Sequence, residues 1–347
     1  GSAFGLDLFR ASLDGSQPLL PLTGPSTQAE SVGNTVLLEA TGAHVVYVSE
    51  QRLWTVPTDA SAPPSVLSPL VAGNGFEDSP ENVRLGADGA RVVFVLDRQA
   101  TFGLDLYELY SAPSDGSQPA VRLHPALANN AQVFHFALTP DSTHVVFSAR
   151  LTDPGPLALY SVPIDGSAAP TRISLPLANR EVLVGAPTAA EEFQIAPDGR
   201  SVVYLAGSGS PGGKYELHAV PSDGSAGGVR LNGNLPPGGD ALAFEPYYDP
   251  NSGFHIAGRF RIAPDSRHVV YVADQRVDGQ FELFSTPLPE FHGHAGPTER
   301  ARSVRLSLPQ PGEFLTHFAI SPDGNTGVYL AGSVFRVPIE GGTPVRL

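Results

Sequence analysis

Hydrophobic and polar residues alternate along this chain in short stretches that turn residues interrupt at regular intervals. Five stretches share two β-branched residues followed by an aromatic residue, and a sixth is a degenerate copy: Val45-Val46-Tyr47, Val92-Val93-Phe94, Val145-Val146-Phe147, Val202-Val203-Tyr204, Val269-Val270-Tyr271 and Gly327-Val328-Tyr329. Short runs of this composition between turn signals are typical of β-strands. The pattern therefore predicts an all-β chain.

These strands lie between two kinds of turn, except that the repeat with Val269-Val270-Tyr271 has an irregular insertion in place of the second turn. The first turn occurs as Asp88-Gly89, Asp141-Ser142, Asp198-Gly199, Asp265-Ser266 and Asp323-Gly324, with Thr41-Gly42 as a weaker copy. The second occurs as Asp59-Ala60-Ser61, Asp115-Gly116-Ser117, Asp165-Gly166-Ser167, Asp223-Gly224-Ser225 and Glu340-Gly341-Gly342. Asp-Gly pairs supply the positive φ of a tight turn. We interpret the Asp residues as acceptors of backbone N–H groups rather than as calcium ligands.

The complete unit recurs at intervals of about 50 residues, a period at which propeller blades fall. Full repeats cover approximately 31–68, 81–124, 132–174, 190–231, 256–307 and 313–347, and a half-unit at 4–22 matches only the last two strands. A single four-stranded antiparallel unit cannot bury both of its faces, and radial stacking solves that problem. We predict one β-propeller domain over residues 1–347 with seven blades, one of them incomplete. Six blades with an extra hairpin is the alternative.

Two motifs carry a resemblance to a known family. Pro197-Asp198-Gly199 precedes Val202-Val203-Tyr204, and Leu159-Tyr160 leads to Val162-Pro163 and Asp165-Gly166-Ser167. This combination resembles the TolB-like (PD40, WD40-like) repeat family, over nearly the whole chain. The resemblance is specific for fold rather than for function. It implies a bacterial protein that is periplasmic or secreted.

The charge and composition exclude several functions. The chain has 35 acidic and 21 basic residues and a net charge of -14, which repels phosphate backbones, so no nucleic-acid partner is expected. It has no Cys, which excludes disulfides and thiolate sites. No apolar run reaches the roughly 18 residues of a transmembrane segment, so no membrane insertion is expected. Gly1-Ser2 is typical of a tag remnant, and we expect the native N-terminus to be missing.

The first strand of each repeat is expected to be innermost, and polar residues at aligned positions there are candidates for binding. The candidates are Asn82, His135, Glu192, Arg259, Arg261 and His317. Polar groups at such positions ordinarily form hydrogen bonds across a water-filled channel. As an alternative, His135, Glu192 and His317 would be metal ligands if they converged.

A second group of candidates lies in the long loop from Asn232 to Ile256. Phe244, Tyr247, Tyr248 and Asp249 combine aromatic rings with a carboxylate, a mixture that suits a sugar or a protein partner. The competing interpretation is that the aromatic rings fold under the loop and fix it in place.

No motif in the sequence supplies catalytic machinery. There is no GxSxG nucleophile elbow, phosphate-binding loop or HExxH helix. We therefore assign no catalytic residue and expect no cofactor. The expected function is that of a monomeric, non-catalytic interaction module that binds a protein or a cell-envelope glycan through its loop-rich rim and channel mouth. The alternative is a metal-assisted, lyase-like carbohydrate-active enzyme with a site at the channel mouth.

Overall fold

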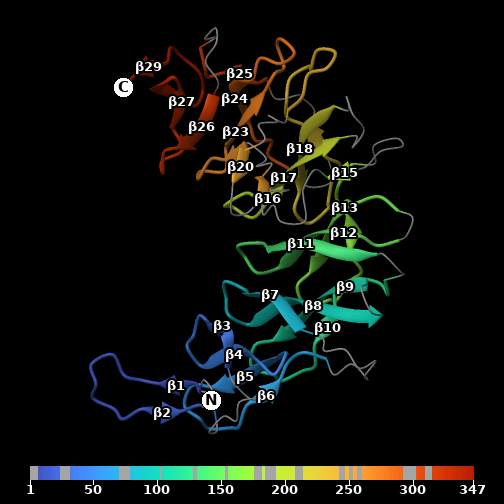
Figure 1. Cartoon of the computed structure of the whole chain (residues 1–347), viewed down its shortest axis with the longest axis vertical. Helices are drawn as coiled ribbons and strands as arrows, with labels where there is room; N and C mark the ends of the chain where they lie inside the picture. Colours follow the sequence, from blue (N-terminus) through green and yellow to red (C-terminus); the bar gives the residue numbers. More distant parts are fainter. Residues whose placement is uncertain are drawn as a thin grey trace. The chain divides into compact units, whose positions relative to one another are not determined.

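The computed structural model describes residues 7–23, 32–69, 79–101, 104–127, 131–152, 155–175, 182–183, 193–207, 214–241, 247–249, 253–255, 260–291, 302–308 and 315–347. Among these residues, the regular secondary structure consists of β-strands alone (Figure 1). The chain forms two compact units, Gly1–Gly155 with Val162–Pro170, and Pro156–Ser161 with Thr171–Leu347.

The first unit begins with a hairpin and continues with two four-stranded antiparallel sheets in simple sequential order. The hairpin is β1 (Phe9–Arg10) and β2 (Leu20–Pro21). The first sheet contains β3 (Val32–Leu38), β4 (His44–Ser49), β5 (Arg52–Pro57) and β6 (Ser65–Val66). The second contains β7 (Ser79–Leu85), β8 (Arg91–Thr101), β9 (Leu104–Pro113) and β10 (Val121–Arg122). The next sheet contains β11 (Gln132–Leu138), β12 (His144–Arg150), β13 (Ala158–Pro163) and β14 (Thr171–Arg172).

The second unit contains three further sheets and a short hairpin. One sheet is β17 (Ser201–Gly207), β18 (Tyr215–Pro221) and β19 (Val229–Arg230), with β15 (Val182–Leu183) and β16 (Phe193–Ile195) both pairing with β17. The hairpin is β20 (Tyr247–Asp249) and β21 (Gly253–His255). The others are β22 (Phe260–Ile262), β23 (His268–Ala273), β24 (Glu282–Pro287) and β25 (Val304–Arg305), then β26 (Leu315–Ile320), β27 (Thr326–Ala331), β28 (Ser333–Pro338) and β29 (Val345–Arg346).

This topology confirms the predicted fold class. The chain is all-β and is built from the four-stranded antiparallel blades of a β-propeller. The β1–β2 hairpin occupies the predicted half-unit and pairs Phe9 with Pro21 and Arg10 with Leu20. The strands of the described residues thus fit either predicted count, a seventh incomplete blade or a hairpin added to six. The single-domain boundary of 1–347 stays a prediction.

The Asp residues of the turns act as predicted. In ten turns, the Asp Oδ1 accepts the backbone N–H of the residue two positions later, and the donor–acceptor distances are 2.9–3.1 Å; the Asp residues are Asp14, Asp59, Asp88, Asp115, Asp141, Asp165, Asp198, Asp223, Asp265 and Asp323. The next residue takes a positive φ, such as 74° at Gly89 and 58° at Ser142. Their side chains are used for turn geometry.

The core lies between successive sheets. The second strand is buried on both faces in most sheets, as shown by Val92, Val93 and Phe94 of β8, which are all 0% exposed. In β27 of the last sheet, Leu330 is 38% exposed. One cluster joins Val46 and Leu53 of the first sheet to Val92 and Phe94 of the second. Stacking of adjacent sheets therefore provides the hydrophobic burial that one sheet alone lacks.

In the β1–β2 hairpin and in five of the sheets, a polar side chain that follows the last strand accepts a hydrogen bond from the backbone of the strand before it. Thr23, Ser68, His124, Ser174, Asn232 and Ser307 accept the backbone N–H groups of Leu8, Leu53, Leu109, Leu159, Leu217 and Leu283, respectively, at 2.8–3.2 Å. The side chain satisfies a donor that would otherwise be buried without a partner. The first of these contacts shows that the β1–β2 hairpin keeps the geometry of the repeat.

No helix capable of crossing a membrane is found in the part of the chain that the structure describes.

Candidate functional site

The first strands of four sheets contain an irregularity at the positions singled out in the sequence. The register shifts between Val32 and Val36 in β3, Glu81 and Arg84 in β7, Val133 and His135 in β11, and Leu315 and His317 in β26. A β-bulge leaves one residue unpaired and redirects side chains, and bulges are frequent beside functional sites. The bulges thus set the direction of the candidate side chains at Asn82, His135 and His317.

In the first unit, Arg84 of β7 acts electrostatically on His135 of β11, and Asn82 lies two residues before Arg84 on β7. Asn82 is exposed and has a φ of 49°, and Arg84 is also exposed. His135 is partly buried, and burial lowers its pKa below the ordinary value of 6.5. The positive charge of Arg84 lowers the pKa of His135 further. The imidazole is therefore mostly neutral at neutral pH, beside an exposed guanidinium group.

In the second unit, a polar side chain on a first strand binds the backbone of the neighbouring sheet. Gln194 Nε2 donates to the carbonyl oxygen of Phe260 at 3.1 Å, and Gln194 Oε1 accepts the N–H of Ile262 at 3.3 Å. This amide joins the first strands of two adjacent sheets. Arg261 is exposed and donates from Nη1 to the carbonyl oxygen of Phe260 at 3.2 Å, and His317 is exposed. First-strand polar residues thus include at least one purely structural bridge.

The remaining candidates lie in a hairpin of the second unit or outside the described residues. Tyr247, Tyr248 and Asp249 form β20, which pairs with β21 in a stretch that the sequence predicted only as a loop. Phe244, Glu192 and Arg259 lie outside the described residues. His135 belongs to the first unit and His317 to the second. Among the described residues, no group of three His, Cys, Asp or Glu side chains is arranged to hold a metal ion.

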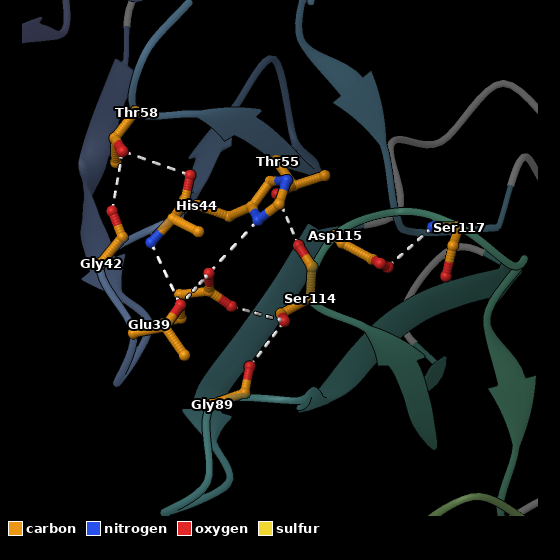
Figure 2. A network of polar contacts seen from close by, with 11 residues as sticks. Glu39, Gly42, His44, Thr55, Thr58, Gly89, Ser114, Asp115 and Ser117 are labelled. Atoms are coloured by element: carbon orange, nitrogen blue, oxygen red, sulfur yellow. Dashed lines mark hydrogen bonds and ion pairs between the residues drawn. The ribbon is translucent and has the colours of Figure 1, made fainter. Parts of the chain in front are cut away.

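A buried carboxylate in the first unit forms a network that the sequence did not predict (Figure 2). Glu39, between β3 and β4, is 8% exposed. Its Oε1 accepts a hydrogen bond from Thr41 Oγ1 at 2.8 Å and lies 3.2 Å from His44 Nδ1. Its Oε2 lies 3.1 Å from Ser114 Oγ, which belongs to the turn between β9 and β10. Burial raises the pKa of Glu39, but the hydrogen bonds outweigh burial and leave it below 4.5.

The network contains Ser, His and Glu side chains, but it does not have the geometry of a nucleophilic triad. In such a triad the imidazole lies between the hydroxyl and the carboxylate, so that it can accept the hydroxyl proton. Here the carboxylate lies between Ser114 and His44. The single proton of the Ser114 hydroxyl is shared between the Glu39 carboxylate and the carbonyl oxygen of Gly89, which lies 2.6 Å from Oγ. Thr55 Oγ1 donates to the Ser114 carbonyl oxygen at 2.6 Å. The arrangement joins two sheets and does not activate a nucleophile.

One sequence signal could have identified this network. Glu39 occupies a position at which the other repeats have small or short side chains, namely Gly86, Thr139, Ala196, Ala263 and Ser321. A carboxylate at a position otherwise filled by small residues requires partners when it is buried.

The chain is similar to several solved structures, at low sequence identity. No protein-family model and no curated protein matches the sequence. A TolB from Agrobacterium tumefaciens is 15% identical, with a TM-score of 0.34, over 95% of this chain and 83% of that chain. An oligogalacturonate lyase in complex with manganese is 14% identical, with a TM-score of 0.44, over 97% of this chain and 81% of that chain.

A puromycin-hydrolyzing peptidase from Mycobacterium tuberculosis is 16% identical, with a TM-score of 0.44, over 95% of this chain. This chain spans 48% of the length of the peptidase. The manganese of the lyase and the substrate of the peptidase are properties of those proteins.

Proposed function

We propose that this chain is a non-catalytic interaction module that binds a partner protein or a cell-envelope glycan. In the first unit, the ligand contacts the bulged first strands β7 and β11. In this proposal the protein works in the periplasm or outside the cell as a monomer, without a cofactor.

The observation that carries the proposal is the group of Asn82, Arg84 and His135 on β7 and β11. Two of these side chains are exposed, and the third is partly buried. Arg84 offers a planar guanidinium that can bind a carboxylate through two parallel hydrogen bonds. Asn82 adds an amide, and a neutral His135 adds one donor and one acceptor. Such a set favours a ligand with carboxylate and hydroxyl groups, as found in peptides and acidic glycans.

A metal-assisted, lyase-like enzyme is the second candidate, and the chemistry of His135 favours it. A neutral imidazole is the form that binds a metal ion, and burial keeps His135 in that form. The positive charge of Arg84 disfavours a metal ion at His135, because a guanidinium that repels the proton of His135 also repels a metal cation. We therefore give preference to binding without a metal.

The test compares two matched double variants of the full chain. Asn82→Ala with Arg84→Ala removes the proposed contacts, and Asn325→Ala with Arg336→Ala removes exposed side chains of the same types elsewhere. Affinity is measured by calorimetry against a panel of peptidoglycan fragments, acidic oligosaccharides and purified envelope proteins. We expect one ligand to bind the control normally and the first variant at least about 10-fold more weakly, or about 1.4 kcal/mol.

Metal analysis by mass spectrometry separates the two candidates. A stoichiometric transition metal that is lost in a His135→Ala, His317→Ala variant would support the enzyme and contradict the proposal. Ligand binding that is equally strong in both double variants would also contradict it.

A further inference from the structure

Asn232 is the one amide among the six polar side chains that follow a last strand and accept a backbone N–H. The equivalent residues are Thr23, Ser68, His124, Ser174 and Ser307. Asn232 also precedes a glycine. Asn followed by Gly is the pair that loses ammonia most readily in a polypeptide, because glycine has no side chain that hinders its backbone nitrogen. A structural contact and a chemically labile pair therefore coincide at Asn232-Gly233.

Two hydrogen bonds hold the side chain of Asn232, which is 4% exposed. Its Oδ1 accepts the N–H of Leu217 at 2.8 Å, and its Nδ2 donates to the carbonyl oxygen of Gly233 at 2.9 Å. A backbone N–H can only donate, so the contact with Leu217 fixes which way the amide points. Rotation of the amide would leave the N–H of Leu217 without an acceptor in a buried environment.

The backbone nitrogen of Gly233 is held by the neighbouring sheet. It donates to Gln275 Oε1 at 2.9 Å. The same oxygen accepts the hydroxyl of Tyr271 at 3.0 Å, and Gln275 Nε2 donates to Ser303 Oγ at 3.1 Å. Tyr271 is 0% exposed, so the acceptor of the Gly233 N–H is attached to the core of its sheet.

Deamidation needs both of these groups to be released. The Gly233 nitrogen loses its proton to the solvent and attacks Cγ of Asn232, and Nδ2 takes up a proton and leaves as ammonia. The five-membered succinimide that results is opened by water at either of its carbonyl groups, which gives aspartate or isoaspartate. One water molecule is consumed and one ammonia is released overall. In the closed arrangement, hydrogen bonds hold the attacking nitrogen and the amide that it would attack.

We propose that Asn232-Gly233 is a site of spontaneous deamidation, which the contacts with Leu217 and Gln275 hold unreactive until the segment 231–241 opens. Local opening of a surface segment costs less free energy than unfolding of a whole sheet. The product prevents closure, because a carboxylate oxygen replaces Nδ2 beside the carbonyl oxygen of Gly233 and both atoms are acceptors. Isoaspartate also adds a methylene group to the main chain. The site is separate from the residues of the proposed function.

The experiment compares the full chain in neutral buffer with the same chain in concentrated urea at the same pH. Mass spectrometry of the proteolytic peptide that contains Asn232 measures its conversion over time. We expect conversion in buffer to be at least about 10-fold slower than in urea, which corresponds to an opening free energy of about 1.4 kcal/mol. Asn232→Ser, which supplies the hydroxyl found in other sheets, should fold and show no conversion at this position. Equal rates in buffer and in urea overturn the proposal.

Matched variants test the role of Gln275. Gln275→Ala frees the Gly233 nitrogen and should speed conversion in buffer at least about 5-fold. Gln275→Glu keeps an acceptor oxygen and should keep the slow rate. Gln280→Ala removes an exposed side chain of the same loop between β23 and β24 and should also keep it. An unchanged rate in Gln275→Ala, or the same increase in Gln280→Ala, overturns the proposal.

A second measurement does not depend on how well Gln275→Ala folds. Asn232→Asp carries the charge of the product and should speed hydrogen exchange of the peptide covering residues 231–241 at least about 10-fold. Asn234→Asp is the control in the same segment, because it keeps the oxygen that accepts from Arg230 Nη2. Equal exchange in the two variants would show that the product does not hold the segment open.

Discussion

Ser114 Oγ lies 3.1 Å from the Glu39 carboxylate, across the boundary between the first two full sheets (Figure 2). Other boundaries use a simpler contact, in which a turn hydroxyl accepts a backbone N–H. Ser142 accepts from Asp88 at 3.4 Å, and Ser266 accepts from Asp198 at 3.0 Å. The Glu39 contact is thus a different junction, because it joins the β3–β4 turn to the β9–β10 turn, whereas the two serine contacts join first-to-second-strand turns of neighbouring sheets.

Glu39→Ala should destabilise the fold by about 1–2 kcal/mol, because Thr41 Oγ1, His44 Nδ1 and the buried Ser114 Oγ lose their contact with the carboxylate. Since the pKa of Glu39 is lowered in the folded state, the carboxylate stabilises the fold above the unfolded pKa of about 4.5, and this contribution is lost as the pH falls through the folded pKa. The difference between wild type and Glu39→Gln should therefore shrink in acid. Urea denaturation from pH 7 to pH 3 checks this. Glu340→Ala, at an exposed turn, is the control; an equal loss there would contradict the prediction.

Ser174→Ala should cost about 1–2 kcal/mol, because the N–H of Leu159 loses its acceptor in a buried environment. Ser167→Ala, on an exposed turn of the same sheet, should cost less than about 0.5 kcal/mol. Thermal unfolding followed by circular dichroism compares the two. Similar melting temperatures for both variants would show that water replaces the Ser174 hydroxyl.

His218→Phe should remove part of the acid sensitivity of the fold. His218 is 3% exposed and stacks on Tyr204 at 5.5 Å, and neither ring nitrogen forms a hydrogen bond to a described residue. Burial lowers its pKa to about 4 from 6.5. As the pH falls from about 6.5 to about 4, the unfolded chain binds a proton that the folded chain does not, so wild-type stability falls by at most about 1.4 kcal/mol per pH unit.

The Phe variant should lack this decrease, because phenylalanine has no group to protonate. A Phe side chain fits this position, since other sheets have Phe284 and Phe335 there. His317→Ala, at an exposed site, should keep it. Denaturant titrations at pH 7, 6, 5 and 4 measure the effect, and parallel curves for the wild type and His218→Phe would refute it.

The repeat pattern was sufficient to predict the blade strands and their turns, because period-two strands and positive-φ turns are local properties. Asp88 and Gly89 form the predicted turn for reasons contained in adjacent residues. Contacts between sheets depend on residues far apart in sequence. Glu39 and Ser114 are 75 residues apart, and the repeat pattern of each gives no sign that the two side chains meet.

The candidate site was predicted only in part. Alignment of the repeats identified Asn82 and His135 as corresponding positions, and the structure places both at bulges. The alignment did not indicate that the charge of Arg84 acts on His135, because that effect depends on the direction in which a bulge turns each side chain. It also gave no reason to expect that Gln194 bridges two sheets.

Arg84→Gln should raise the pKa of His135. Both burial and the guanidinium charge lower that pKa, so removal of the charge moves it toward 6.5, while burial keeps it below that value. The imidazole signals in an NMR titration report the shift directly. Arg336→Gln, which removes an exposed charge that does not contribute to the pKa shift of His135, should leave the His135 titration unchanged. An unchanged His135 titration in Arg84→Gln would show that the two side chains do not interact in solution.

Gly89→Ala should be far more damaging than Gly42→Ala, although both glycines have nearly the same φ, 74° and 73°. A left-handed conformation costs an alanine about 1–2 kcal/mol at either position. At Gly42 an added Cβ meets nothing within 4 Å, whereas at Gly89 it lies 2.7 Å from Ala40 N and 3.2 Å from Glu39 Cβ. The clash of the added Cβ at Gly89 should cost about 1–3 kcal/mol beyond the conformational cost and push the two sheets apart at the Glu39 network. Urea denaturation of both variants measures the difference, and equal losses would mean that the two sheets can move apart at this boundary without cost.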